Sequence, residues 1–226
     1  MSARLAGLLE PARAVEVASR LSTPFLAEIA VELDPRRANA VIANISPRQI
    51  AAVTGELVAR REYVTMGRYV GHLGDDALAA ALEAMDDASL LQVAFVLEDK
   101  RRLERLVEAL PEPRLAGIVH AAAAGDLWVE AMDLLNHVSE SQRDVFVAIT
   151  LELEPVALEA IIAAVIEHDL WQEVLVIAEQ DARLQGKLVE RVPTLSRRQR
   201  RAIAARAREG GAVARLGALG QALVRG

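Results

Sequence analysis

The chain has 226 residues, a hydrophobic fraction of 53%, an aromatic fraction of 3% and a formal net charge of −6. It contains no cysteine, which excludes disulfides, thiolate nucleophiles and cysteine-ligated metal centres and is typical of a reducing compartment. The longest apolar runs, such as Ala160 to Ile166, are far shorter than the roughly 18 residues of a membrane span. The N-terminus also lacks the apolar core of a signal peptide, so we expect a soluble, cytoplasmic protein.

Helical spacing of alanine, leucine, valine and isoleucine predicts an all-α fold, because strand-type alternation is nearly absent. Helix starts are marked by a capping side chain directly before proline, as at Thr23-Pro24, Asp34-Pro35 and Ser46-Pro47. An N-terminal helix over 3–20 is expected to break at Pro11. The helices predicted after it run over 24–33, 35–45, 47–60, 62–73, 75–85, 87–98, 100–110, 113–124, 127–138, 141–152, 155–167, 170–180, 182–192, 196–208 and 212–224.

Parts of the sequence recur at a fixed distance. Asp34-Pro35-Arg36-Arg37 returns 65 positions later as Asp99-Lys100-Arg101-Arg102, and at the same offset Tyr63 returns as Trp128. Such periodicity predicts an α-solenoid, or superhelix, of short helices with about three repeats of roughly 65 residues, similar to armadillo and HEAT proteins. We expect one repeat domain over 1–226, with a helical cap at 1–21 and repeats at 22–88, 89–155 and 156–226.

No catalytic, cofactor or metal motif is present, so we predict no enzymatic activity and no cofactor. His72 and His137 occupy equivalent positions near predicted helix C-termini, where an imidazolium gains from the helix dipole, and a structural role is expected for both. Trp128 and Trp171 could stack on a base or a ligand. Their counterparts in the other hairpins are tyrosine and leucine, which favours a packing role.

Acidic pairs lie at predicted helix ends: Asp75-Asp76, Asp86-Asp87 and Glu98-Asp99. Helix capping and compensation of the helix dipole explain the first two pairs. Several such carboxylates from adjacent units could also gather Mg²⁺ through weak, hydrated contacts.

The C-terminal segment from Leu195 to Gly226 is strongly basic. Its eight arginines and one acid give it a net charge of +7, so that with −6 for the whole chain residues 1–194 carry −13. The segment could pack against its own body or a neighbouring subunit, bind a polyanion, or form a solvated helix. The candidate polyanion- or partner-binding residues are Arg197, Arg198, Arg200, Arg201, Arg206 and Arg208.

The last predicted helix carries small residues among apolar ones on one side. This pattern predicts a tight seat on a preceding helix or a contact between subunits of a homo-oligomer. The residues on that side are Val213, Leu216, Gly217, Gly220 and Leu223.

Residues 22–60 resemble the N-terminal α-superhelical domain of MgtE-type magnesium transporters and, more loosely, the armadillo-like domains of the flagellar motor switch protein FliG. The resemblance is carried by Leu33-Asp34-Pro35-Arg36-Arg37, Val41-Ile42, Ser46-Pro47 and Ile50-Ala51. It implies a helical scaffold that touches other domains, with acidic Mg²⁺ contacts as a further implication. Membrane spans and paired nucleotide-binding (CBS) domains of the transporters are not expected in this chain, which we therefore read as a stand-alone relative.

Three hypotheses follow. The first is a non-enzymatic protein-interaction or scaffold module that binds another protein on a curved helical-repeat surface. The second is binding of nucleic acid or another polyanion through the arginine-rich segment. The third is Mg²⁺ sensing through helix-end carboxylates.

Overall fold

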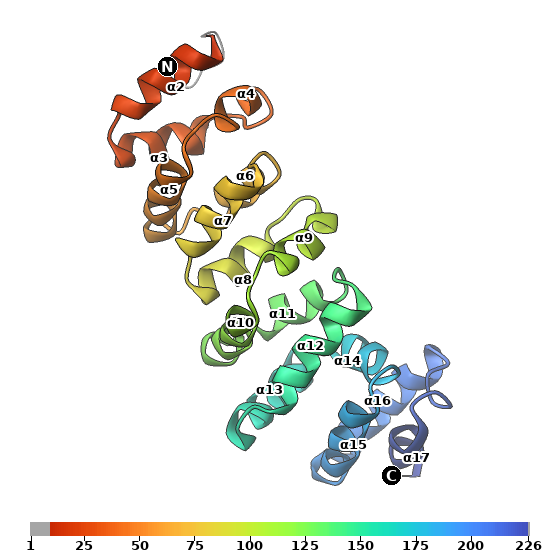
Figure 1. Ribbon diagram of the computed structural model, residues 1–226. Helices are drawn as coiled ribbons and strands as arrows, with labels where there is room; N and C mark the ends of the chain where they lie inside the picture. The colour runs from red at the N-terminus through yellow and green to blue at the C-terminus, as the bar shows by residue number, and fades with distance from the viewer. Residues whose placement is uncertain (1–9, 226) are drawn as a thin grey trace. The chain divides into compact units, whose positions relative to one another are not determined.

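The computed structural model describes residues 10–225, and all regular secondary structure within them is helical, as predicted (Figure 1). The chain divides into two compact units, Met1–Ile118 and Val119–Gly226, and helix α10 (Glu112–Gly125) crosses the boundary. No helix among the described residues is long and apolar enough to cross a membrane. The other helices of unit 1 are α2 (Pro11–Arg20), α3 (Thr23–Glu32), α4 (Asn39–Ile42), α5 (Pro47–Ala59), α6 (Tyr63–Val70), α7 (Asp75–Glu83), α8 (Asp87–Phe95), η1 (Lys100–Arg102) and α9 (Leu103–Glu108).

Unit 1 is built from helices that pack on the next helix but one along the chain. Helix α3 packs on α5 and α5 on α7, while α2 packs on α4 and α6 on α8. Alternate helices therefore form two rows, visible in Figure 1 as α3 and α5 on one side and α4 and α6 on the other. The buried side chains of unit 1 include Ala27, Leu57 and Val93, all at most 5% exposed.

Unit 2 contains α11 (Trp128–Leu135), α12 (Glu140–Leu151), α13 (Pro155–Glu167), α14 (Trp171–Ala178), α15 (Ala182–Arg191), η2 (Val192–Thr194), α16 (Arg197–Glu209) and α17 (Gly217–Arg225). Alternate packing recurs here, since α14 packs on α16 and α15 on α17. The most deeply buried large side chains are Ile203, Leu216 and Leu219. The end of the chain is thus a part of the core of unit 2.

Three hairpins turn through the same backbone conformation. Arg61, Asp126 and Asp169 have φ angles of 59°, 53° and 57°, in the left-handed region. In each case the next N–H bonds to a carbonyl five residues back, as from Leu127 to Ala122 at 3.0 Å, which satisfies a carbonyl at the helix end. The next short helix then begins at Tyr63, Trp128 or Trp171. The three aromatic residues therefore follow turns of the same backbone conformation.

Most predicted helix boundaries agree with the structure to within three residues, and α13 agrees at both ends. The prediction of a helix over 35–45 is wrong, because only Asn39–Ile42 is α-helical. The Asp34 side chain accepts the backbone N–H of Arg36 at 3.0 Å and forms a turn instead of a helix cap. Pro35 is buried in that turn and starts no helix.

The prediction over 212–224 is also wrong at its start, since α17 begins at Gly217. Gly217 has a φ angle of 50°, in the left-handed region, so a continuous right-handed helix cannot pass through it from residue 212, and residues 213–216 form turns. At the other end of the chain α2 begins at Pro11, as expected, and the part of that prediction over 3–9 lies outside the described residues.

Acid should weaken unit 2 through the cap of α15. Burial raises the pKa of Asp181, but hydrogen bonds from the Arg183 guanidinium and from two backbone N–H groups outweigh it and hold the pKa below its ordinary value of 3.8. A depressed folded pKa contributes stability that is present above about pH 4 and is lost as the pH falls through the folded value. We expect urea unfolding between pH 7 and pH 3 to show this loss. Asp181→Asn, which keeps an acceptor oxygen but does not titrate, should show less of it.

Candidate functional site

The six candidate arginines all lie on α16, and the structure separates them into two groups. Arg197, Arg198, Arg201 and Arg208 are exposed, and among the described residues none of them makes an ion pair or a side-chain hydrogen bond. Arg206 pairs with Asp169 of the same unit, so its guanidinium already has an anionic partner. Arg200 is half-buried, with an Nε that has no partner among the described residues. Four of the six are therefore available to an anionic ligand.

The basic segment also packs against its own unit, which was the first of the alternatives left open. Ile203, Ala204 and Ala207 of α16 are at most 2% exposed. Arg215 donates from Nε and Nη2 to both oxygens of Glu179, at 2.6 and 3.1 Å. Helix α17 also packs against its own unit, because it contacts α15 and α16. Leu216, directly before α17, is fully buried.

His72 and His137 both lie close to polar side chains of their own units. Its Nδ1 lies 3.0 Å from Oδ1 of Asn39. Burial, followed by the charges of Arg102 and Arg36, lowers the pKa of His72, so the neutral imidazole is favoured. His137 lies at the equivalent place after α11, with its Nε2 3.9 Å from Asp133.

Four of the six carboxylates considered for Mg²⁺, namely Asp75, Asp87, Glu98 and Asp99, pair with arginines. Asp75 pairs with Arg105, and Asp87 lies 2.8 Å from Arg114. Asp86 instead caps α8 by accepting the backbone N–H of Ser89 at 2.7 Å, which is the main cause of its lowered pKa. Over residues 10–225 no group of three metal-ligating side chains comes together.

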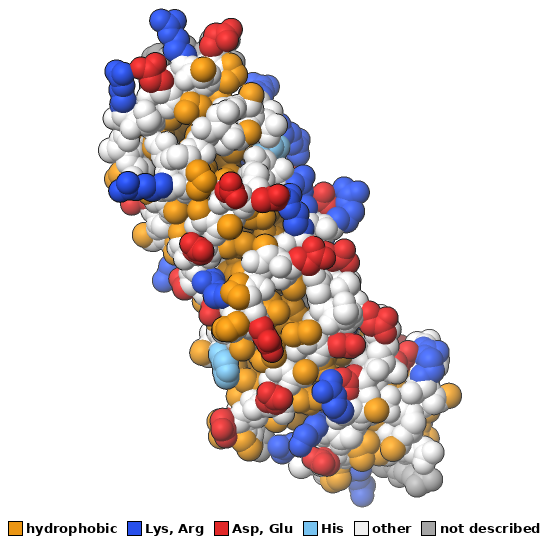
Figure 2. Space-filling view, in the orientation of Figure 1, with side chains coloured by type: hydrophobic (Ala, Val, Ile, Leu, Met, Phe, Trp, Pro, Cys, Tyr) orange, Lys and Arg blue, Asp and Glu red, His pale blue; other side chains and the backbone are white. Residues whose placement is uncertain are grey.

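An apolar groove of about 350 Å³ lies between the two rows of helices in unit 1. Except for Gln49, Thr54 and Tyr69, every side chain that lines it is apolar. Val17 and Phe25 line it and are 47% and 39% exposed, so they form an apolar lip. Figure 2 shows hydrophobic side chains reaching the surface between the α5–α7 row and the α4–α6 row. Unit 2 has a smaller groove of similar character, of about 180 Å³.

Polar groups in the groove of unit 1 are already largely satisfied. The Tyr69 hydroxyl donates to the carbonyl of Ala30 at 3.1 Å, and the Gln49 amide donates to the carbonyl of Ala18 at 2.7 Å. Burial raises the pKa of Tyr69 to about 12, so the hydroxyl stays protonated. The groove thus offers an apolar surface with few free hydrogen-bonding groups.

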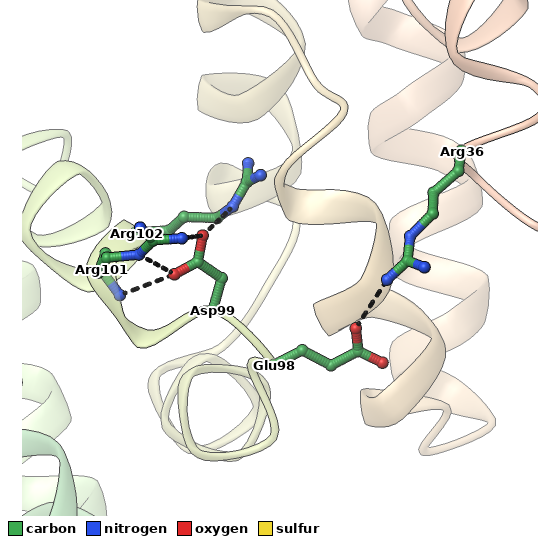
Figure 3. Close-up of polar contacts among 5 residues, drawn as sticks. All are labelled: Arg36, Glu98, Asp99, Arg101 and Arg102. Atoms are coloured by element: carbon green, nitrogen blue, oxygen red, sulfur yellow. Dashed lines mark hydrogen bonds and ion pairs between the residues drawn. The ribbon is translucent and has the colours of Figure 1, made fainter.

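A polar cleft of about 450 Å³ lies elsewhere in unit 1, and both copies of the Asp-x-Arg-Arg repeat line it. Arg36 pairs with Glu98 at 3.5 Å, while Asp99 lies between Arg101 at 2.8 Å and Arg102 at 3.5 Å (Figure 3). In each copy the aspartate accepts the backbone N–H two residues on, at 3.0 Å for Asp34 and 3.3 Å for Asp99. The two segments that the 65-residue offset relates are therefore brought to one place.

Comparison of the chain with models of protein families, with curated proteins and with solved structures finds no match.

The sequence did not predict the apolar groove or the polar cleft of unit 1. The lip residues Val17 and Phe25 carry no distinguishing signal, because an exposed and a buried apolar residue look alike in a helical pattern. The cleft did have a signal in the recurrence of Asp34 to Arg37 as Asp99 to Arg102. The recurrence predicts a repeated architecture, and in the structure it also places both segments at one cleft.

Proposed function

We propose that this chain is a non-enzymatic interaction module in which the apolar groove of unit 1 binds an amphipathic helix of a partner protein. The observation that carries the proposal is the open groove with its exposed lip. Packing of alternate helices and the recurring hairpin turn support a repeat architecture of the α-solenoid type, and proteins of that type present such surfaces to partners. The resemblance of residues 22–60 to transporter scaffold domains supports the same function.

A helix suits this groove better than an extended peptide. The groove walls are helices, whose backbone groups bond to one another, so they leave no row of donors and acceptors for an added strand. An extended peptide buried there would leave its own N–H and C=O groups unsatisfied, at a cost of several kcal/mol. A helix satisfies those groups internally and needs only an apolar face, as in known helix-in-groove complexes.

Crosslinking from the groove lip tests the proposal. A photoreactive residue in place of Phe25 in the full chain should crosslink to one protein, and the crosslink should map to an amphipathic helix. A synthetic peptide of that helix should then bind the unmodified chain. Val17→Asp should weaken this binding at least tenfold, because a carboxylate at the lip opposes an apolar face.

Val64→Asp is the matched control, since Val64 is 62% exposed in unit 1 and lies outside the groove. Equal binding by the wild type, Val17→Asp and Val64→Asp would place the partner elsewhere. Crosslinks found only to lipid or detergent would show that the groove takes acyl chains and would overturn the proposal.

The exposed arginines of α16 support a second candidate function, binding of a nucleic acid or another polyanion. Neutralisation of phosphates by several arginines predicts an affinity that falls steeply with salt. Titration of duplex and single-stranded DNA into the full chain and into Arg197→Gln/Arg201→Gln/Arg208→Gln should show the steep salt dependence for the full chain alone. These three side chains are exposed, so the variant should stay folded. Equally weak binding by both proteins would remove this candidate.

A further inference from the structure

The polar cleft of unit 1 and the arginines that flank it together hold more positive charge than the carboxylates that line the cleft. Its lining includes the guanidinium groups of Arg36, Arg68 and Arg102. Two further arginines flank it, because Arg37 and Arg101 pair with lining carboxylates.

The carboxylates are matched one by one. Arg37 lies 3.8 Å from Asp34, Arg101 lies 2.8 Å from Asp99, and Arg36 lies 3.5 Å from Glu98. The five guanidiniums therefore exceed the three carboxylates, Asp34, Glu98 and Asp99, by two formal charges.

Arg68 and Arg102 hold the surplus. Arg68 donates to the carbonyl of Leu33 at 3.2 Å and has no carboxylate partner within residues 10–225. Arg102 shares Asp99 with Arg101, whose bond to that carboxylate is the shorter.

Local geometry places these groups. The guanidinium of Arg102 occupies the space where a side chain on Gly71 would lie, so only glycine at that position lets it sit against α6. Gly67 also lines the cleft. His72 lines the same cleft, and after burial the charges of Arg102 and Arg36 both lower its pKa.

We propose that this cleft is a binding site for a phosphate group, recognised by Arg36, Arg68 and Arg102. A phosphate monoester carries about −1.5 to −2 charges at pH 7, which matches the surplus. Guanidinium groups suit it, because their planar donors pair with two phosphate oxygens at once. The volume of about 450 Å³ leaves room for more than the anion, as a monoester requires. The site is separate from the apolar groove, and neither depends on the other.

Calorimetric titration of the full chain with inorganic phosphate tests this site, with sodium chloride at matched ionic strength as the reference. Glycerol phosphate in a second arm distinguishes a monoester from free phosphate. We expect saturable binding of at least one of them and none of chloride. Arg68→Gln should weaken binding at least tenfold and Arg36→Gln several-fold. Gly71→Ala should also weaken it without changing any charge, because it displaces Arg102.

Arg48→Gln is the control for charge, since Arg48 is exposed on α5 and lies outside the cleft. It should bind like the wild type. The proposal would be overturned if titration with phosphate released or absorbed no more heat than titration with chloride. Equal losses in Arg48→Gln and Arg36→Gln would also overturn it, because they would indicate a general charge effect. If circular dichroism shows that Arg68→Gln does not fold, Arg36→Gln and Gly71→Ala decide the question.

Discussion

Replacing Trp128 with alanine is expected to lower the free energy of unfolding of unit 2 by about 4 kcal/mol. The Trp128 side chain is 3% exposed at the start of α11, so the substitution removes a large apolar group and leaves a cavity. Urea unfolding followed by circular dichroism measures the loss. A packing role and a ligand-caging role differ here, since a caging tryptophan on a surface could be removed at little cost in stability.

Trp128→Phe is the informative companion. The indole Nε1 of Trp128 is buried and has no hydrogen-bond partner among the described residues. Phenylalanine loses some packing but also removes this unsatisfied donor, whose burial costs roughly 1 to 3 kcal/mol. We expect the two effects to offset each other within about 1.5 kcal/mol. A Trp128→Ala variant as stable as the wild type would contradict the packing role.

Gly220→Ala is the second substitution with a large expected effect, a loss of about 3 kcal/mol in the same measurement. A methyl group on Gly220 would overlap the carbonyl oxygen of Val213 and lie 3.0 Å from its carbonyl carbon. Backbone cannot move aside as the end of a flexible side chain does, so α17 would have to shift away from its seat.

Gly186→Ala should change stability in the opposite direction. Gly186 lies in α15 with nothing near the position of an added methyl group, and alanine is favoured over glycine in a helix by about 1 kcal/mol. Equal effects of the two substitutions would show that the contact between Gly220 and Val213 does not limit the packing of α17.

The helices could be predicted from sequence because their signals are local. Ser139 and Ser196 each form a capping box with a glutamine three residues on, and α12 and α16 begin directly after them. Helix periodicity and proline placement act within a few residues, so no knowledge of the tertiary fold was needed. The prediction over 35–45 was wrong because a side chain competed with the helix, since Asp34 accepts the N–H of Arg36.

The candidate sites were harder to predict, since they depend on which segments meet. The arginines of α16 were visible as a charged run, but the loss of Arg206 to Asp169 depends on residues 37 positions apart. The polar cleft is still harder to predict from sequence. Arg68 donates to a carbonyl, whereas the flanking Arg37 and Arg101 pair with carboxylates. Nothing in the local sequence indicates that difference.

The three hairpin residues with positive φ angles, Arg61, Asp126 and Asp169, are positions at which the stability of the chain could be raised. The left-handed conformation lowers the stability of the folded state by roughly 1 to 2 kcal/mol when the residue is not glycine. Glycine avoids this strain, but it loses more conformational entropy on folding, so only a part of that stability is gained. Asp169 is committed to Arg206, but Arg61 and Asp126 make no ion pair within residues 10–225. Glycine at these two turns would give a more heat-resistant form of the chain, in which damaging substitutions in either unit could be studied without loss of the folded protein.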